Sequence, residues 1–284
     1  MVDVLHLSAF PAAEGGGNPA GVVLDASALT DVEMQNLAAR LGYAESAFLV
    51  RPPTVAERRV GIRYFSPIAE VPFCGHATIA SAVALAERLG SGPFVFETPV
   101  GPVAIETAEA DDGVRASFTS VEPVVSELPD ATLDRLLALL GLGRADLAPG
   151  RPPRLAEAGN PHPVLVLADQ ATFDGVAFEP DAVRALMDEH GWVTVALVHA
   201  GASLAEIEVR NLFPVGTLTE DPATGAAAAA LGGYLRALGL VRPPVDVDVR
   251  QGRHVGRPSV LHVHVPASGG ITVSGTAVRI PHPL

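Results

Sequence analysis

Short runs in which apolar and polar residues alternate dominate this chain, and they predict a protein built mostly of β-strands. Such alternation places every second side chain on the same face of a sheet. In the first part of the chain we expect strands near residues 2–9, 21–24, 45–50, 60–65, 94–97, 103–106 and 114–118.

Two segments of this first part have the spacing of helices instead. One follows Thr30, which has capping-box spacing with Glu33, and Gly42 lies where that helix should end. The other begins near Gly75 and ends before Gly90. Strands interrupted by only two helices indicate a mixed α+β fold rather than a regular βαβ alternation.

The same order of elements returns about 150 residues later, as in a chain that contains two copies of one unit. The repeated segments are Gly17-Asn18-Pro19 with Gly159-Asn160-Pro161, Arg63-Tyr64-Phe65 with Arg210-Asn211-Leu212, and Gly75 with Gly225. Several matches in the same order predict two pseudo-symmetric halves that face each other across a cleft.

We place the first half at residues 1–118 and the second half at residues 129–269. Residues 120–129 have the Pro and acidic residues of a connector, and the second half opens with an extra helix near residues 132–140. The final strand, near residues 270–284, has no counterpart at the end of the first copy. We expect it to cross back and pair with the first half.

Composition excludes several classes of partner and location. A net charge of -13 and a sequence pI of about 5.0 argue against nucleic acid or an anionic membrane surface. No apolar run is long enough to span a bilayer, and the start of the chain alternates like a strand without the basic residues of a signal peptide. The single Cys excludes an internal disulfide and fits a cytoplasmic protein.

The chain contains no Lys, and every residue counted as Lys or Arg is Arg. Catalysis through a lysine Schiff base, pyridoxal phosphate held on a lysine, and a Walker-type phosphate loop are therefore excluded.

A tight turn at a Gly precedes an apolar helix twice, at Gly75 and at Gly225. The free N–H groups and positive dipole of such a helix start favour anions. Residues 226–230 are all Ala, which lets backbone or ligand approach the second helix closely. Two equivalent starts in a duplicated fold suggest a cleft that binds one carboxylate.

Five motifs in order resemble those of the phenazine-biosynthesis PhzF-like isomerase family. They are Gly17-Asn18-Pro19-Ala20-Gly21, Glu45-Ser46-Ala47-Phe48, Glu70-Val71-Pro72-Phe73-Cys74-Gly75-His76-Ala77-Thr78, Glu220-Asp221-Pro222-Ala223-Thr224-Gly225, and Gln251-Gly252 with Gly256-Arg257-Pro258-Ser259. The resemblance implies a diaminopimelate-epimerase-like fold, in which each half is a mixed sheet or open barrel around a central helix. It also implies a cofactor-independent homodimer that acts on a small-molecule carboxylate by moving a proton along a conjugated system.

The resemblance assigns the general acid/base to Glu45 and active-site polar roles to His76 and Asp221. Substrate binding would fall to the helix starts, that is to Gly75, Thr224, Gly225 and Ala226. Without the resemblance, Glu45 could be a carboxylate bonded to backbone at a strand edge. His76 could likewise be a simple cap or a surface residue, and Asp221 a turn or N-cap residue before Pro222.

Three further residues refine this assignment. Thr194 occupies the position of Glu45 in the second copy and cannot act as a base. Ala226 stands where the family usually has a Ser, so a hydroxyl for the substrate carboxylate is missing and the characterised substrate is in doubt. Cys74 has no second thiol as a partner, which excludes two-thiol racemisation, and we interpret it as a small packing residue.

A metal site is not predicted. His262 and His264 share one face of a strand, but we find no carboxylate or third His at ligand spacing nearby and interpret both as solvated.

The sequence thus predicts an isomerase that moves a proton on a small unsaturated carboxylic acid through Glu45. The alternatives are a related lyase or tautomerase on another small acid, and a small-anion binding protein without turnover.

Overall fold

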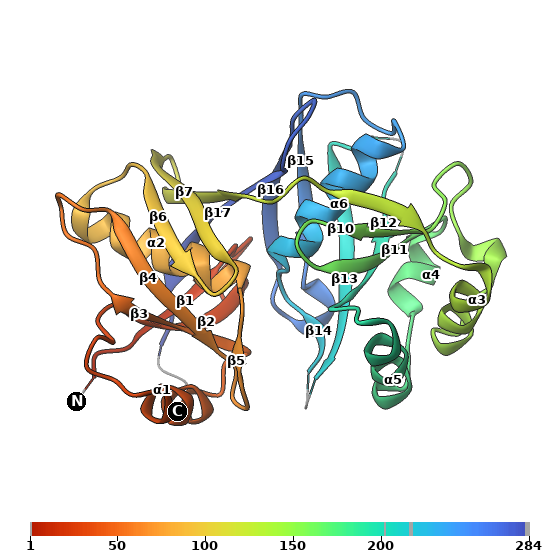
Figure 1. The fold of residues 1–284 in the computed structure, drawn as a ribbon. Coiled ribbons are helices and arrows are strands. Elements are labelled where there is room, and N and C mark those ends of the chain that lie inside the picture. Colours follow the sequence, from red (N-terminus) through yellow and green to blue (C-terminus); the bar gives the residue numbers. More distant parts are fainter. Residues whose placement is uncertain (1, 202, 216–217, 282–284) are drawn as a thin grey trace. The chain divides into compact units, whose positions relative to one another are not determined.

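The computed structural model of the protein describes residues 2–201, 203–215 and 218–281. Contacts within the chain divide it into two compact units. The first comprises Met1–Thr119 and Ser274–Leu284, and the second comprises Ser120–Val273. Figure 1 labels the helices and strands. Among the described residues, no helix has both the length and the apolar character needed to cross a membrane.

The first unit is a closed barrel of strands around one helix. In barrel order its strands are β17 (Thr272–Arg279), β1 (Leu5–Ala9), β2 (Asn18–Val23), β3 (Glu45–Arg51), β4 (Arg59–Phe65), β6 (Phe94–Thr98), β7 (Gly101–Ala110) and β8 (Gly113–Thr119). The barrel closes because β8 pairs with β17, which also pairs antiparallel with β1. The pairs β2–β3 and β4–β6 are parallel, and the short β5 (Glu70–Val71) pairs with β4.

The helix α2 (Gly75–Leu89) contacts β1, β2, β3, β7 and β8, and Figure 1 shows it among these strands. Its residues are buried without interruption from His76 to Ala86, and most of them are Ala, Ser or Thr. Such small side chains let a helix fit inside a barrel, and burial on all sides explains its lack of a polar face. Gly90 caps its end, so the predicted bounds of this helix are confirmed.

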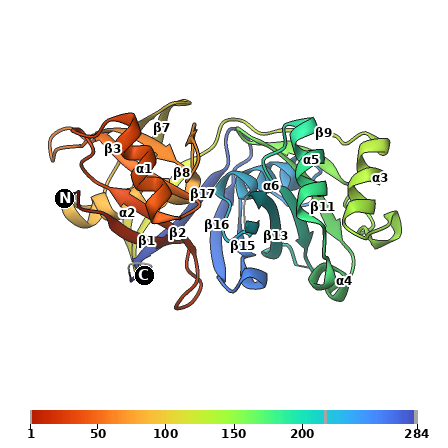
Figure 2. The same ribbon diagram turned by 90° about the horizontal axis from the view of Figure 1, so that it is seen from below.

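The helix α1 (Asp31–Leu41) covers the outside of the same barrel (Figure 2). The predicted capping box of Thr30 and Glu33 is present, and Gly42 ends the helix in the left-handed conformation. Its buried Met34 packs in a cluster with Phe48 of β3.

The second unit repeats this plan. Its strands pair in the order β9 (Val124–Glu127), β10 (Arg154–Glu157), β11 (Pro161–Leu167), β12 (Val195–His199), β13 (Glu206–Val215), β15 (Val245–Gln251) and β16 (Ser259–Val265). β14 (Leu218–Asp221) pairs with β13 as β5 pairs with β4. The Ala-rich α6 (Gly225–Ala237) contacts β9, β10, β11 and β16 and is buried, like α2.

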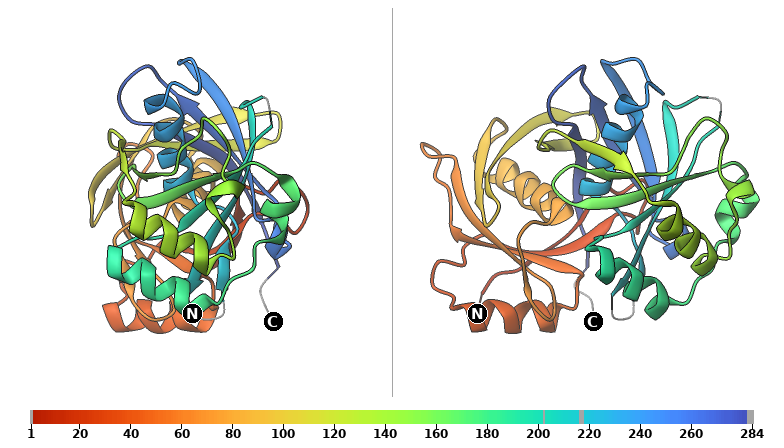
Figure 3. Two further views of the ribbon diagram at one scale, coloured as in Figure 1. Left: turned by 90° about the vertical axis from the view of Figure 1, so that its right-hand side faces the viewer. Right: turned by 45° about the vertical axis from the view of Figure 1, so that its right-hand side comes forward.

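Three more helices cover the outer face of the second unit, and they are drawn in green shades in Figure 3. They are α3 (Asp130–Leu139), α4 (Gln170–Gly175) and α5 (Pro180–His190), and the 3-10 turns η1 (Arg144–Asp146) and η2 (Arg253–Val255) lie in connections. Apolar side chains of α3 and α5, such as Leu136 and Met187, pack against Leu165 of β11 and Leu197 of β12.

The structure corrects the prediction for residues 120–129, which were expected to be a connector. They contain β9, which pairs antiparallel with β10 of the second unit. β10 pairs with β11 as β1 pairs with β2, so β10 is the counterpart of β1. Since β17 pairs antiparallel with β1, β9 is the counterpart of β17. The prediction that the final strand has no counterpart was therefore wrong. The sequence did not reveal β9 because the strand is only 4 residues long and mostly exposed.

An ion pair is duplicated together with the fold. Arg63 of β4 bonds Glu70 of β5 at 2.7 Å, and Arg210 of β13 bonds Glu220 of β14 at 2.6 Å. The first pair is partly exposed, whereas both side chains of the second are only 6% exposed. Arg210 also donates to the backbone carbonyls of residues 173, 174 and 176 around the end of α4, which satisfies its buried guanidinium.

Candidate active site

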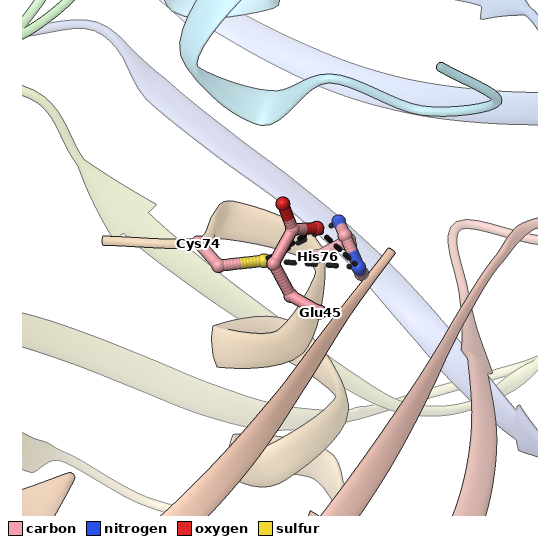
Figure 4. Close-up of side chains that lie close together, drawn as sticks. All are labelled: Glu45, Cys74 and His76. Atoms are coloured by element: carbon pink, nitrogen blue, oxygen red, sulfur yellow. Dashed lines mark hydrogen bonds and ion pairs between the residues drawn. The ribbon is translucent and has the colours of Figure 1, made fainter. Parts of the chain in front are cut away.

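Three polar side chains gather at the N-terminus of α2 and point toward one another (Figure 4). Glu45 is the first residue of β3, Cys74 is the N-cap of α2 and His76 is the second residue of that helix. Glu45 Oε2 lies 3.6 Å from His76 Nε2 and 3.7 Å from Cys74 Sγ. The structure thus brings together two of the predicted catalytic residues.

The barrel explains why Glu45 and His76 meet. β3 runs parallel to β2, and its first residue, Glu45, pairs with Ala20. The helix α2 packs against both strands. The side chain of Glu45 is 17% exposed, so it is largely buried and retains some access to solvent.

His76 is a neutral hydrogen-bonding group. Burial lowers its pKa from 6.5 to about 3, because the protonated ring would lose its hydration. The side-chain amide nitrogen of Asn18 lies 3.1 Å from Nδ1, and an amide nitrogen can only donate. The ring proton therefore lies on Nε2, which faces Glu45.

Cys74 has more contacts than the packing role predicted for it. Its side chain is buried, yet Sγ lies 3.4 Å from Nδ1 of His76 as well as 3.7 Å from Glu45. The thiol thus forms part of the polar environment of the candidate base. The sequence contained the signal, because Cys74 comes two residues before His76 in the same motif.

The three groups offer donor atoms within 4.8 Å of one another, but their geometry does not suit a metal ion. The sulfur is nearly equidistant from the two ring nitrogens of His76, at 3.4 and 3.7 Å. An ion about 2.1 Å from either nitrogen along its lone pair would stay more than roughly 3.5 Å from the sulfur, against about 2.3 Å for a Zn–S bond.

His262 and His264 are not simply solvated, as the sequence suggested. They face acidic residues of the neighbouring strand: His262 bonds Asp248 at 2.6 Å, and His264 bonds Asp246 at 2.7 Å. The cross-strand register of β15 and β16 creates both pairs, and spacing along the chain could not reveal them.

The other predicted site residues lie in the second unit, at the start of α6. Asp221 ends β14, Thr224 is the N-cap, and Gly225 and Ala226 form the first turn of the helix. The hydroxyl of Thr224 donates to Asp221 Oδ2 at 2.6 Å. Asp221 is therefore not the N-cap of α6, but it is held beside that cap.

Thr194 is the counterpart of Glu45, as the sequence predicted. The parallel register of β11 and β12 pairs Val164 with Ala196, so Thr194 falls opposite His162. In the first unit the same register places Glu45 opposite Ala20. The hydroxyl of Thr194 bonds His162 Nδ1 at 2.9 Å.

Sequence reasoning missed several polar residues at these positions. Asn18 orients His76, and Gln251 bonds the segment from Asp221 to Thr224. Both belong to motifs quoted above, although neither was given a role. Asn211 and His162 lie in strands and carried no signal in the sequence beyond their place in the repeat.

The duplicated order of strands around a buried helix places the protein in the class of diaminopimelate-epimerase-like folds. Residues 7–282 match the family described as "Phenazine biosynthesis-like protein", and the chain belongs to that family.

Curated relatives of the chain support its membership of this family. An uncharacterised isomerase of Escherichia coli strain K12 is 31% identical, over 98% of this chain and 96% of the relative. The trans-2,3-dihydro-3-hydroxyanthranilate isomerase of Pseudomonas chlororaphis is 28% identical, over 96% of this chain and 95% of the relative. The protein is therefore an isomerase of this family.

Solved structures show the same fold. A predicted epimerase of Pseudomonas aeruginosa superposes with a TM-score of 0.85 at 28% identity, covering 99% of this chain and 98% of the other. A hydroxyproline epimerase of Agrobacterium vitis superposes with a TM-score of 0.65 at 14% identity, covering 98% and 90%. The second likeness concerns the fold alone.

Proposed function

We propose that the protein isomerises a small unsaturated carboxylic acid without a cofactor, and that Glu45 alone moves the proton. The observation that carries the proposal is the meeting of Glu45 with neutral His76 at the start of α2. A carboxylate can take a proton from one carbon of a conjugated acid and return it to another. The two transfers balance, so the product differs from the substrate only in the position of one hydrogen and of the double bonds.

His76 would support these transfers without exchanging its own proton. Its Nε2–H faces the carboxylate of Glu45, and a pKa of about 3 keeps the ring neutral at physiological pH. A neutral ring can orient the carboxyl group or the substrate by hydrogen bonding and cannot compete as an acid.

The first turns of α2 and α6 would bind the carboxylate of the substrate. Backbone N–H groups at a helix N-terminus favour an anion. We assign this role to Gly75 in the first unit and to Thr224, Gly225 and Ala226 in the second, with Asp221 orienting the substrate. Ala226 offers its N–H but no hydroxyl, which favours a substrate that differs from those of relatives with a Ser at this position.

The proposal is tested by assaying wild type, Glu45→Gln and Cys74→Ala against a panel of unsaturated cyclic carboxylic acids that includes trans-2,3-dihydro-3-hydroxyanthranilate. We expect Glu45→Gln to lower kcat by about 10²- to 10⁴-fold, the usual contribution of a general acid/base. Cys74→Ala should stay within about threefold of wild type. Loss of activity in Cys74→Ala alone would instead identify the thiol as the base.

We also propose that the protein works in the cytoplasm as a homodimer. The resemblance to a family of homodimers supports the second part, and the single Cys of the chain supports the first. Light scattering coupled to gel filtration should give twice the chain mass of 29.3 kDa.

A further inference from the structure

We propose that Gln251, supported by Asn211, Thr194 and His162, is a positioning residue that holds the carboxylate of Asp221 in one orientation. The proposal rests on the role that the proposed function gives to Asp221. It is carried by a chain of hydrogen bonds inside the second unit, in which every donor and acceptor has a defined direction.

This chain of hydrogen bonds ends at the start of α6. Gln251 Nε2 donates to the backbone carbonyl of Asp221 at 2.6 Å and to the hydroxyl of Thr224 at 3.0 Å. The same hydroxyl donates its own hydrogen to Asp221 Oδ2 at 2.6 Å. Gln251 Oε1 accepts from the backbone N–H of Thr224 at 3.3 Å. One amide side chain thus fixes both ends of the segment that carries Asp221.

The chain continues from Gln251 into the core. Asn211 Nδ2 donates to Gln251 Oε1 at 3.0 Å, and Asn211 Oδ1 accepts the hydroxyl hydrogen of Thr194 at 3.1 Å. These bonds fix the amide planes of both residues, because each amide uses its oxygen and its nitrogen toward different partners. Gln251, Asn211 and Thr194 are all at most 3% exposed, so water does not compete for the bonds.

His162 begins this chain of hydrogen bonds, and the directions of the bonds determine the tautomer of the His162 ring. Because the hydroxyl hydrogen of Thr194 goes to Asn211, His162 Nδ1 must donate to Thr194, and its proton lies on Nδ1. His162 Nε2 is buried and has no hydrogen-bond partner among the described residues. The side-chain donors therefore all point in one direction, from His162 through Thr194, Asn211, Gln251 and Thr224 to the carboxylate of Asp221.

A glycine lets Gln251 reach this segment. Gly252 has a φ of 82°, and a Cβ there would lie 2.6 Å from the carbonyl oxygen of Pro222 and 2.3 Å from that of Arg257. The end of β15 therefore touches the turn between Asp221 and Thr224. No residue with a side chain could allow this approach without moving the backbone.

The first unit shows that the fold does not require this chain. The strand registers make Tyr64 the counterpart of Asn211, Val71 that of Asp221, and Thr98 that of Gln251. Tyr64 bonds Thr78 of α2, and Thr98 bonds Gly101 in its own turn. The same barrel thus forms without a polar chain at these positions.

Burying polar side chains carries a desolvation cost. The first unit shows that the barrel forms without the polar side chains of this hydrogen-bond chain. The presence of these buried polar side chains in the unit that carries Asp221 is explained if the orientation of Asp221 matters to the reaction. An isomerase that moves a proton between two carbons depends on such orientation, because small displacements lower the rate by orders of magnitude.

The test compares Gln251→Met, which keeps the size of the side chain, with Tyr64→Phe as a matched control. Tyr64→Phe removes a buried hydrogen bond at the position of the first unit that corresponds to Asn211 in the second. Gln251→Glu is the second variant in case Gln251→Met does not fold, because an ionised carboxylate retains the acceptor oxygen but cannot donate to Asp221 and Thr224.

The first readout needs no substrate. Crystal structures should show that Asp221 changes its side-chain orientation, or loses its bond to Thr224, in the Gln251 variants and not in Tyr64→Phe. Long-range ¹H–¹⁵N spectra should show the Nδ1–H tautomer of His162 in wild type. An unchanged Asp221 in both Gln251 variants, or the Nε2–H tautomer in wild type, would overturn the proposal.

The second readout separates positioning from general stability. On an acid that wild type isomerises, the Gln251 variants should lower kcat by about 10- to 100-fold while KM stays within about threefold, and Tyr64→Phe should leave both near wild type. If Glu45→Gln abolishes turnover but the Gln251 variants keep the wild-type kcat, the positioning role fails and the proposed function stands. If Glu45→Gln has no effect, the proposed function fails, and the crystal structures still decide whether Gln251 holds Asp221.

Discussion

Gly252→Ala should destabilise the protein several times more than Gly256→Ala, although the two glycines lie close together in the chain. Both have a positive φ, 82° at Gly252 and 70° at Gly256. An alanine in this conformation costs about 1 kcal/mol or somewhat more. At Gly256 a Cβ would meet nothing within 4 Å, so this conformational strain is the whole expected cost.

At Gly252 the added Cβ would also collide with backbone. It would lie 2.3 Å from the carbonyl oxygen of Arg257 and 2.6 Å from that of Pro222, and neither atom can move as the end of a flexible side chain would. Overpacking of this kind costs about 1–3 kcal/mol. Together with the strain, we expect Gly252→Ala to lower the free energy of unfolding by about 2–4 kcal/mol.

Thermal unfolding followed by circular dichroism measures the difference. For a chain of this size 1 kcal/mol corresponds to about 2–4 °C, so Tm should fall by about 3 °C in Gly256→Ala and by about 10 °C in Gly252→Ala. Gly252→Ala should also lower kcat, because the displaced β15 end carries Gln251 away from Asp221. Equal losses of Tm in the two variants would refute the close approach on which this reasoning depends.

Two further predictions concern stability. Arg210→Met should cost about 3–5 kcal/mol because it leaves a buried glutamate unpaired, whereas Arg63→Met at the equivalent, partly exposed pair should cost at most about 1 kcal/mol; urea unfolding of both variants checks the contrast. Burial lowers the pKa of His76 to about 3 and that of His162 to about 4, so below pH 6.5 the unfolded chain binds protons that the folded protein does not. The free energy of unfolding should therefore fall as pH is lowered from about 6.5 toward 4, and His162→Gln should make this fall less steep. An identical dependence on pH in wild type and His162→Gln would show that His162 is not buried in its neutral form.

Much of the fold could be predicted because it rests on local patterns. The capping box at Thr30, the glycine that ends α2 and the repeated motifs all arise from short-range chemistry, and the structure contains each of them. The strand β9 was missed because its pattern is mostly exposed, and only pairing with β10 makes it a strand.

The same distinction applies to the candidate site. Glu45 and His76 were found through motifs, and the structure brings them to 3.6 Å. The hydrogen bonds from His162 to Gln251 join segments that are far apart in the sequence, so only strand register could reveal them. Residue types alone also could not show that burial keeps His76 neutral.

The most direct test of the account is the rate at which Glu45→Gln isomerises an unsaturated carboxylic acid that wild type converts, followed by ¹H NMR. The substitution keeps the size of the side chain and removes only its ability to exchange a proton. We expect a rate at least about 10²-fold below that of wild type, with the thermal stability of the protein retained. Product formation by Glu45→Gln at the wild-type rate would contradict it.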